Sequence, residues 1–165
     1  MIVVSNSSPL IALARIGQLI LLANLYEKIL IPSEVHDEVI VAGSGLPGAE
    51  AVRNASWIEV VPQNSAVDAS LFQACRHLGA GERGAIFLAR GLPADLILVD
   101  ERKARRIAVA AGLSVVGCLG ILEAGARRGL VSDIRETYVE LLRQGVRLEI
   151  RLLQDSLKRF GLPKL

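Results

Sequence analysis

Residues 95–100 read Asp95-Leu96-Ile97-Leu98-Val99-Asp100, with four consecutive apolar residues between two acids. A short apolar run of this kind, without alternating polar positions, is typical of a strand buried on both faces of a parallel sheet. We therefore predict a strand here, followed by a helix from Glu101 to Ala111. This strand and helix form the unit from which the rest of the fold is predicted.

The same unit recurs on both sides of residues 95–100. Ile2-Val3-Val4 predicts a first strand, and Ser8 followed by Pro9 predicts a helix start, because serine is a good N-cap and proline a good first helical residue. Further strands are predicted at 29–31, 57–61 and 113–116, and helices at 49–54, 68–77, 81–90, 119–127, 133–143 and 150–160. This alternation predicts an α/β, three-layer fold with a mostly parallel five-stranded sheet and a helical C-terminal extension.

Composition sets limits on the class of protein. A chain of 165 residues, 52% of them hydrophobic, suits one soluble domain over residues 1–165, with a core at about 1–128 and C-terminal helices at about 129–162. Aromatic residues make up only 4%, which disfavours a binding surface built on base stacking. The two cysteines form no CxxC pair, so we expect neither a zinc site nor disulfides, and a cytoplasmic location.

Polar and acidic residues fall where the predicted strands end. Asn6 follows the first strand, and Asp100 and Glu101 follow the fourth. Glu82 opens a helix after a glycine turn, and Glu38 lies on the helix after the second strand. Because ligands of parallel α/β sheets bind beyond the carboxyl ends of the strands, these side chains are expected at one edge.

Clustered oxygen ligands of this type suit a hard divalent cation. Magnesium and manganese prefer carboxylate and carbonyl oxygens and leave coordination positions open for a substrate phosphate. Such ions promote phosphoryl displacement without a covalent nucleophile on the protein.

Several stretches resemble the PIN-domain family, and more narrowly a prokaryotic subgroup close to the VapC toxins that is described only as predicted nucleic-acid binding. The resemblance covers residues 2 to about 145 with the blocks in order. The blocks are residues 3–11, residues 31–39, Leu78-Gly79-Ala80-Gly81-Glu82, residues 98–106 and Gly117-Cys118-Leu119-Gly120-Ile121-Leu122.

The resemblance implies a magnesium- or manganese-dependent endoribonuclease of the toxin type, often a homodimer and often paired with a small antitoxin protein encoded nearby. Carried over residue by residue, the metal-binding and catalytic positions are Asn6, Glu38, Glu82 and Asp100. Glu101 becomes an auxiliary acid, and Ser8 orients the ligand at position 6. Arg102 and Arg105 are the preferred contacts to RNA phosphates.

Position 6 departs from the family pattern. PIN nucleases generally carry an aspartate there, whereas Asn6 offers a neutral carbonyl oxygen. We expect weaker metal binding and slow or absent hydrolysis. The alternative function is therefore a catalytically weakened or inactive PIN-like module that binds RNA or protein.

Each site residue also has an ordinary structural interpretation. Glu82 suits the N-terminus of any helix, Asp100 could cap the helix that follows it, and Asn6 could belong to a turn. Glu38 could simply be solvated, and Glu101 and Arg105 have the spacing of a common helical ion pair. A small-molecule-binding flavodoxin-like domain is disfavoured, because no strand leads into a GxGxxG or GxxxxGK loop.

The C-terminal helices are rich in apolar residues. Two interpretations remain open: they form a surface for a second subunit or an antitoxin, or they close the core. The residues concerned are Tyr138, Leu141, Leu142, Leu152, Leu153 and Phe160.

Overall fold

A single sheet forms the centre of the computed structural model, which describes residues 1–63 and 66–165. Within those residues the sheet has five strands in the order β3-β2-β1-β4-β5, and every neighbouring pair is parallel. The strands are β1 (Val3–Ser5), β2 (Ile29–Pro32), β3 (Ile58–Val61), β4 (Leu96–Leu98) and β5 (Val115–Val116). The predicted parallel five-stranded sheet is confirmed.

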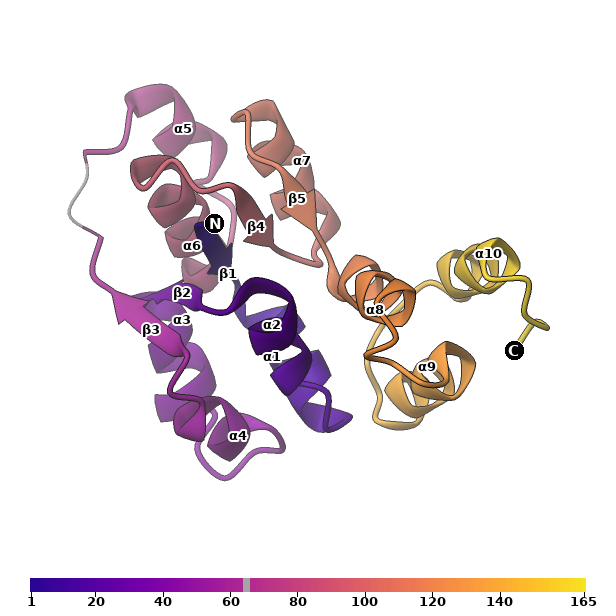
Figure 1. Ribbon diagram of the computed structural model, residues 1–165. Helices are drawn as coiled ribbons and strands as arrows, with labels where there is room; N and C mark the ends of the chain where they lie inside the picture. The colour runs from indigo at the N-terminus through magenta and orange to yellow at the C-terminus, as the bar shows by residue number, and fades with distance from the viewer. Residues whose placement is uncertain (64–65) are drawn as a thin grey trace.

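Helices connect the strands and continue beyond the last one (Figure 1). Between β1 and β4 they are α1 (Ser7–Arg15), α2 (Ile20–Tyr26), α3 (Ser33–His36), the π-helical turn η1 (Asp37–Val41), α4 (Ala49–Asn54), α5 (Ala69–Ala74) and α6 (Ala80–Gly91). After β4 they are α7 (Arg102–Ala110), α8 (Cys118–Arg127), α9 (Ile134–Arg143) and α10 (Ile150–Arg159).

The sheet is covered on both faces, as expected for parallel strands. Val3 and Leu98 point into one apolar cluster, which includes buried residues of α1, α2 and α8. Their neighbours Val4 and Ile97 point into a second cluster with α5, α6 and α7. Successive side chains of each strand thus serve opposite layers, and the predicted three-layer α/β architecture is confirmed.

The C-terminal helices contribute to the first of these clusters. Figure 1 shows α9 and α10 at one end of the molecule, beyond α8 and far from the edge strand β3. Tyr138 and Leu141 of α9 and Leu153 and Leu157 of α10 are fully buried in the cluster. Core closure therefore accounts for the buried members of the apolar set, whereas Leu152 remains 47% exposed.

Two predicted boundaries at the start of the chain are wrong by one or two residues. Strand β1 covers Val3–Ser5 instead of residues 2–4. The N-cap of α1 is Asn6, and not Ser8, so the helix already begins at Ser7. The long apolar stretch that follows is divided into α1 and α2, and no helix among the described residues is long and apolar enough to cross a membrane.

Candidate metal and nucleic-acid site

The strand order brings the carboxyl ends of β1 and β4 together at one edge of the sheet. From β1 the sheet grows one way through β2 and β3, and the other way through β4 and β5. The edge between β1 and β4 is therefore the point where the order reverses, which is the usual ligand position in such sheets. Asn6 follows β1 and donates its backbone N–H to the carbonyl of Leu98 in β4 at 2.9 Å.

Asn6 carries an unsatisfied oxygen at this edge. The residue is 2% exposed, and its Oδ1 accepts no hydrogen bond from the described residues. As N-cap of α1 the side chain also fails to bond the first turn of the helix. A buried amide oxygen without a partner costs roughly 1–3 kcal/mol. An oxygen in this state is suited to act as a ligand of a cation.

Glu38 reaches the same point from the π-helical turn η1. Its Oε2 accepts a 2.8 Å hydrogen bond from the Ser7 hydroxyl. Both side chains pass close to Gly81, where a Cβ atom would overlap the Glu38 carboxylate and lie 3.3 Å from Asn6 Oδ1 and 3.4 Å from Ser7 Oγ. Three side-chain oxygens from two separate segments therefore meet over the bare backbone of Gly81.

Ser7 and Gly81 are members of this group for which the sequence predicted no role. Ser8 was predicted to orient the ligand at position 6, but Ser8 is exposed on α1, whereas Ser7 is buried and bonded to Glu38. Gly81 stood inside the quoted Leu78–Glu82 block, and its position one residue before Glu82 was the available signal.

Glu82 lies in the first turn of α6, next to this group. Its Oε2 accepts the backbone N–H of Gly79 at 3.1 Å, so the carboxylate caps its own helix. Burial raises the pKa of Glu82, the Gly79 N–H opposes that shift, and the negative charges of Glu101 and Glu38 raise the pKa further. The structural interpretation as a capping residue holds, and the acidic neighbours place Glu82 in the same electrostatic field.

Asp100 lies two residues beyond the end of β4. Its Oδ1 accepts the backbone N–H of Cys118, the first residue of α8, at 2.6 Å. Burial raises the pKa of Asp100, and the Cys118 N–H and the charge of Arg105 partly offset this. A Cβ on Gly117 would lie only 2.7 Å from Asp100 Oδ1, so glycine is required for this close approach.

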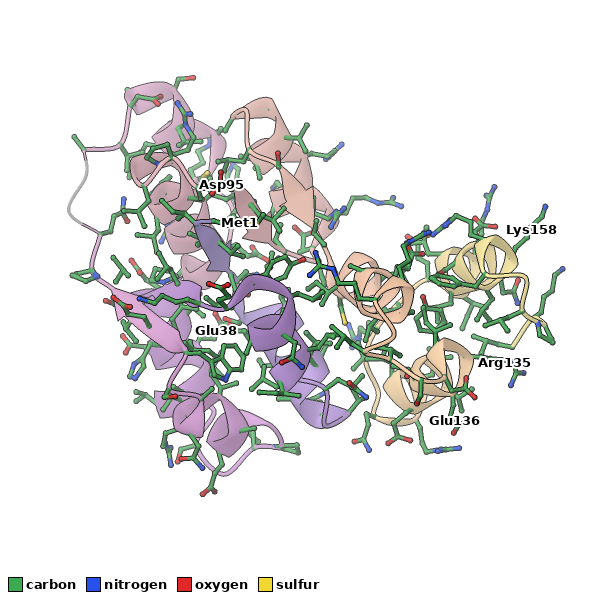
Figure 2. All side chains as sticks on the ribbon, viewed as in Figure 1. Met1, Glu38, Asp95, Arg135, Glu136 and Lys158 are labelled. Carbon is green, nitrogen blue, oxygen red and sulfur yellow. The ribbon has the colours of Figure 1, made fainter. Side chains whose placement is uncertain are left out.

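Asp95, the acid before β4, lies at the opposite edge. Its carboxylate accepts the backbone N–H of Ile2 at 2.6 Å, and Figure 2 labels it beside Met1. The two acids that flank the apolar run therefore have different surroundings, and only Asp100 faces the carboxyl edge.

Glu101 caps helix α7. Its Oε2 accepts the N–H of Ala104 at 2.7 Å. Burial acts to raise the pKa of Glu101, but the N–H groups of Lys103 and Ala104 and the positive charges of Lys103 and Arg106 together lower it. The helical ion pair considered for Glu101 and Arg105 is not formed, since Arg105 donates to the carbonyl of Val99 at 2.9 Å. Arg102, the other expected phosphate contact, is paired with Glu149 at 3.0 Å.

The acids gather at this edge without forming one closed metal cage. Across residues 1–63 and 66–165, no three His, Cys, Asp or Glu side chains are arranged to hold a single ion. The reason is local: Glu82, Asp100 and Glu101 each accept a backbone N–H at a helix start. The free Asn6 oxygen and the Glu38 carboxylate beside it nevertheless fit a divalent cation, which prefers oxygen ligands and few carboxylates.

The chain is an α/β domain with a parallel sheet and acidic side chains near its topological switch point. The family model described as DUF3368, a PIN domain, matches residues 2–162, and the chain belongs to this family. PIN domains generally use divalent metal ions, and the membership indicates nuclease-type function and nucleic-acid binding. No curated protein matches the chain.

Proposed function

We propose that the chain is a metal-dependent endoribonuclease of the VapC-like toxin type, which hydrolyses RNA phosphodiesters at the carboxyl edge of the sheet with Mg²⁺ or Mn²⁺. One observation carries the proposal. The unpartnered Asn6 oxygen and the Glu38 carboxylate converge over Gly81. Asn6 directly follows β1, which pairs with β4, and Asp100 follows β4 at the same edge of the sheet.

In this proposal the chain's own residues bind the cation and orient its ligands. Asn6 and Glu38 hold the cation, Ser7 fixes the Glu38 carboxylate, and Glu82 and Asp100 add negative charge. When bound, a divalent cation stabilises the charge that develops in phosphoryl displacement. The raised pKa of Glu82 supports this assignment, because the negative charges of Glu101 and Glu38 add to the effect of burial and a cation beside these acids would relieve their repulsion. The pKa of Asp100 is raised by burial.

The test is a metal-titrated cleavage assay on RNA with a matched pair of variants. Asp100→Asn, at the carboxyl edge, is expected to abolish cleavage stimulated by Mn²⁺ or Mg²⁺. Asp95→Asn removes the same charge at the other end of β4 and is expected to retain cleavage. Equal cleavage by wild type and Asp100→Asn would contradict the proposal.

A second candidate function is supported by the neutral Asn6. With an amide at this position, and with three acids bonded to backbone N–H groups, the chain would serve as an RNA- or protein-binding module with weak or no hydrolysis. Asn6→Asp tests the metal site on which both candidate functions depend. Calorimetry with Mn²⁺ should show tighter binding in Asn6→Asp than in wild type, and an unchanged affinity would count against the site itself.

The remaining assignments complete the proposal. We expect residues 1–165 to form one domain, with a core at about 1–128 and C-terminal helices at about 129–162, located in the cytoplasm. A homodimer or a small antitoxin encoded nearby is the expected partner, and exposed Leu152 and Ile150 on α10 support a contact surface. Light scattering of the purified chain, alone and co-expressed with the neighbouring gene product, tests both partners; a monomer in both samples would exclude them.

A further inference from the structure

A groove of about 680 Å³ opens directly beside the candidate site. It lies between α7 and the segment that leads from α9 into α10, and Asp100 forms part of its wall. The groove therefore continues from the proposed reaction centre outward along α7. An RNA strand that is cleaved next to Asp100 has to leave the site along a path of this kind.

The charge of the groove is predominantly positive. Its lining contains four arginines, Arg102, Arg105, Arg106 and Arg147, against two acids, Asp100 and Glu149. Planar guanidinium groups bind phosphate oxygens through paired hydrogen bonds. Four guanidinium groups along one groove therefore match a nucleic-acid backbone, which carries a phosphate at every nucleotide.

The four arginines are not equally available. Arg105 is committed to the Val99 carbonyl, and Arg102 is paired with Glu149. Arg106 and Arg147 are exposed, and neither forms an ion pair with an acidic side chain of the described chain. Arg102 and Arg105 were the predicted phosphate contacts, whereas the geometry leaves Arg106 and Arg147 available for a ligand.

Aliphatic side chains complete the groove. Val109 is 61% exposed and Leu152 is 47% exposed, and both line it together with Leu148. They lie between the charged residues and offer an apolar contact for ribose and base surfaces.

We propose that this groove carries the RNA strand away from Asp100, with Arg106 and Arg147 contacting its phosphates and Glu149 competing with the RNA for Arg102. The proposal rests on the proposed function for its ligand, an RNA strand. The exposed ion pair between Arg102 and Glu149 is weak enough for a phosphate to replace the carboxylate. Glu149 thereby limits affinity in the free protein.

The first test compares two arginines of the C-terminal region. Binding of a short fluorescein-labelled single-stranded RNA is measured by anisotropy in EDTA, so that no cleavage occurs. Arg147→Gln should weaken binding about fivefold and lower the slope of log affinity against log salt by about 1. Arg143→Gln removes the same charge from a residue that does not line the groove and should change neither value by a comparable amount. Equal affinities for these two variants would overturn the proposal.

The second test predicts a gain in RNA affinity instead of a loss. Glu149→Gln should free Arg102 and strengthen RNA binding about threefold, which is an ordinary gain for one added phosphate contact. Glu140→Gln breaks the similar exposed pair with Arg143 and loses the same charge away from the groove. An equal gain in both variants would show a general charge effect and contradict the role of Glu149. Circular dichroism of all four variants checks that they are folded.

Failure of this inference is distinct from failure of the proposed function. If the wild type cleaves RNA in an Asp100-dependent way but Arg147→Gln binds RNA normally, only the groove assignment is wrong. If the wild type binds no RNA, the proposed function has failed as well. If Arg147→Gln instead loses binding of a co-expressed protein and keeps RNA binding, the groove belongs to a protein partner and the RNA assignment is overturned.

Discussion

The hydroxyl of Ser7 donates a 2.8 Å hydrogen bond to the carboxylate of Glu38, across 31 positions of the chain. This bond fixes an acid that lies on a short π-helical turn and is otherwise exposed to solvent. It links the first residue of α1 to the segment after β2, and so joins two of the candidate metal-binding elements.

Ser7→Ala should weaken Mn²⁺ binding about tenfold, which is the usual effect of removing a residue that orients a metal ligand. Calorimetry measures the affinity. Ser8→Ala is the matched control, because Ser8 is the next residue and is exposed, and it should bind Mn²⁺ as the wild type does. A larger effect from Ser8→Ala than from Ser7→Ala would restore the role that sequence reasoning gave to Ser8.

Gly81→Ala should displace the Glu38 carboxylate, because the new methyl group would overlap it. We expect metal affinity to fall about tenfold or more, while the free energy of unfolding changes by no more than about 1 kcal/mol, since alanine is the better helix former. Gly79→Ala is the control: its Cβ would meet its nearest neighbour, Glu82 Oε2, at an ordinary 3.7 Å. The two affinities are compared by calorimetry and the stabilities by urea unfolding, and similar affinities would show that Glu38 has room to move.

Glu82 should make the metal-free protein less stable as the pH rises. Its pKa is raised by burial and by the charges of Glu101 and Glu38, so the folded state holds this proton more tightly than the unfolded state does. Its stabilising contribution is full below the ordinary pKa of 4.5 and is lost as the pH rises through the folded-state value. Glu82→Gln keeps the capping geometry and removes the titration, so its melting temperature should exceed that of the wild type near neutral pH and converge with it in acid.

The control for this pH dependence is a carboxyl group whose pKa is shifted in the opposite direction. The pKa of Glu140 is lowered by hydrogen bonds from Gln144 and Arg143. Glu140→Gln should therefore gain no stability over the wild type as the pH rises. The melting temperatures of both variants are followed by circular dichroism in EDTA, and an identical pH response of the two would contradict the assignment to Glu82.

Tyr138 and Ser156 should contribute to the stability of the fold and not to the candidate site. Their hydroxyls lie 2.6 Å apart in the core and connect α9 to α10. Tyr138→Phe leaves the Ser156 hydroxyl buried without this partner and should lower the free energy of unfolding by about 1–2 kcal/mol, measured in urea. Adding Ser156→Ala should recover part of the loss; a double variant less stable than the additive expectation would show that the hydroxyls do not act as a pair.

The sheet was predictable from the sequence because its signals are local. The apolar run before Asp100 and the one before Asn6 each predict a buried strand, and the chain order of strands and helices predicts parallel pairing. Because each predicted strand is followed directly by a loop, the sequence also predicts which residues lie at the carboxyl edge of the sheet. These features depend on burial and on chain direction, and neither requires knowledge of a distant contact.

The details of the site depend on contacts that no local pattern contains. Successive helical residues differ by about 100° in direction, so moving the N-cap from Ser8 to Asn6 decides which serine points inward. Glu101 has the spacing of an ion pair with Arg105, but as the N-cap of α7 it bonds Ala104 instead. The pairing of Arg102 with Glu149 joins residues 47 positions apart and has no sequence signature.

The adjacency of β1 and β4 also constrains when the site can exist. Val3 pairs with Leu96, so the first strand remains without one of its two neighbours until more than half of the chain has been synthesised. Pairing over such a separation is entropically costly and forms late compared with local helices. A nascent chain that ends before β4 already contains Asn6, Glu38 and Glu82, yet it lacks the strand that brings Asp100 beside them.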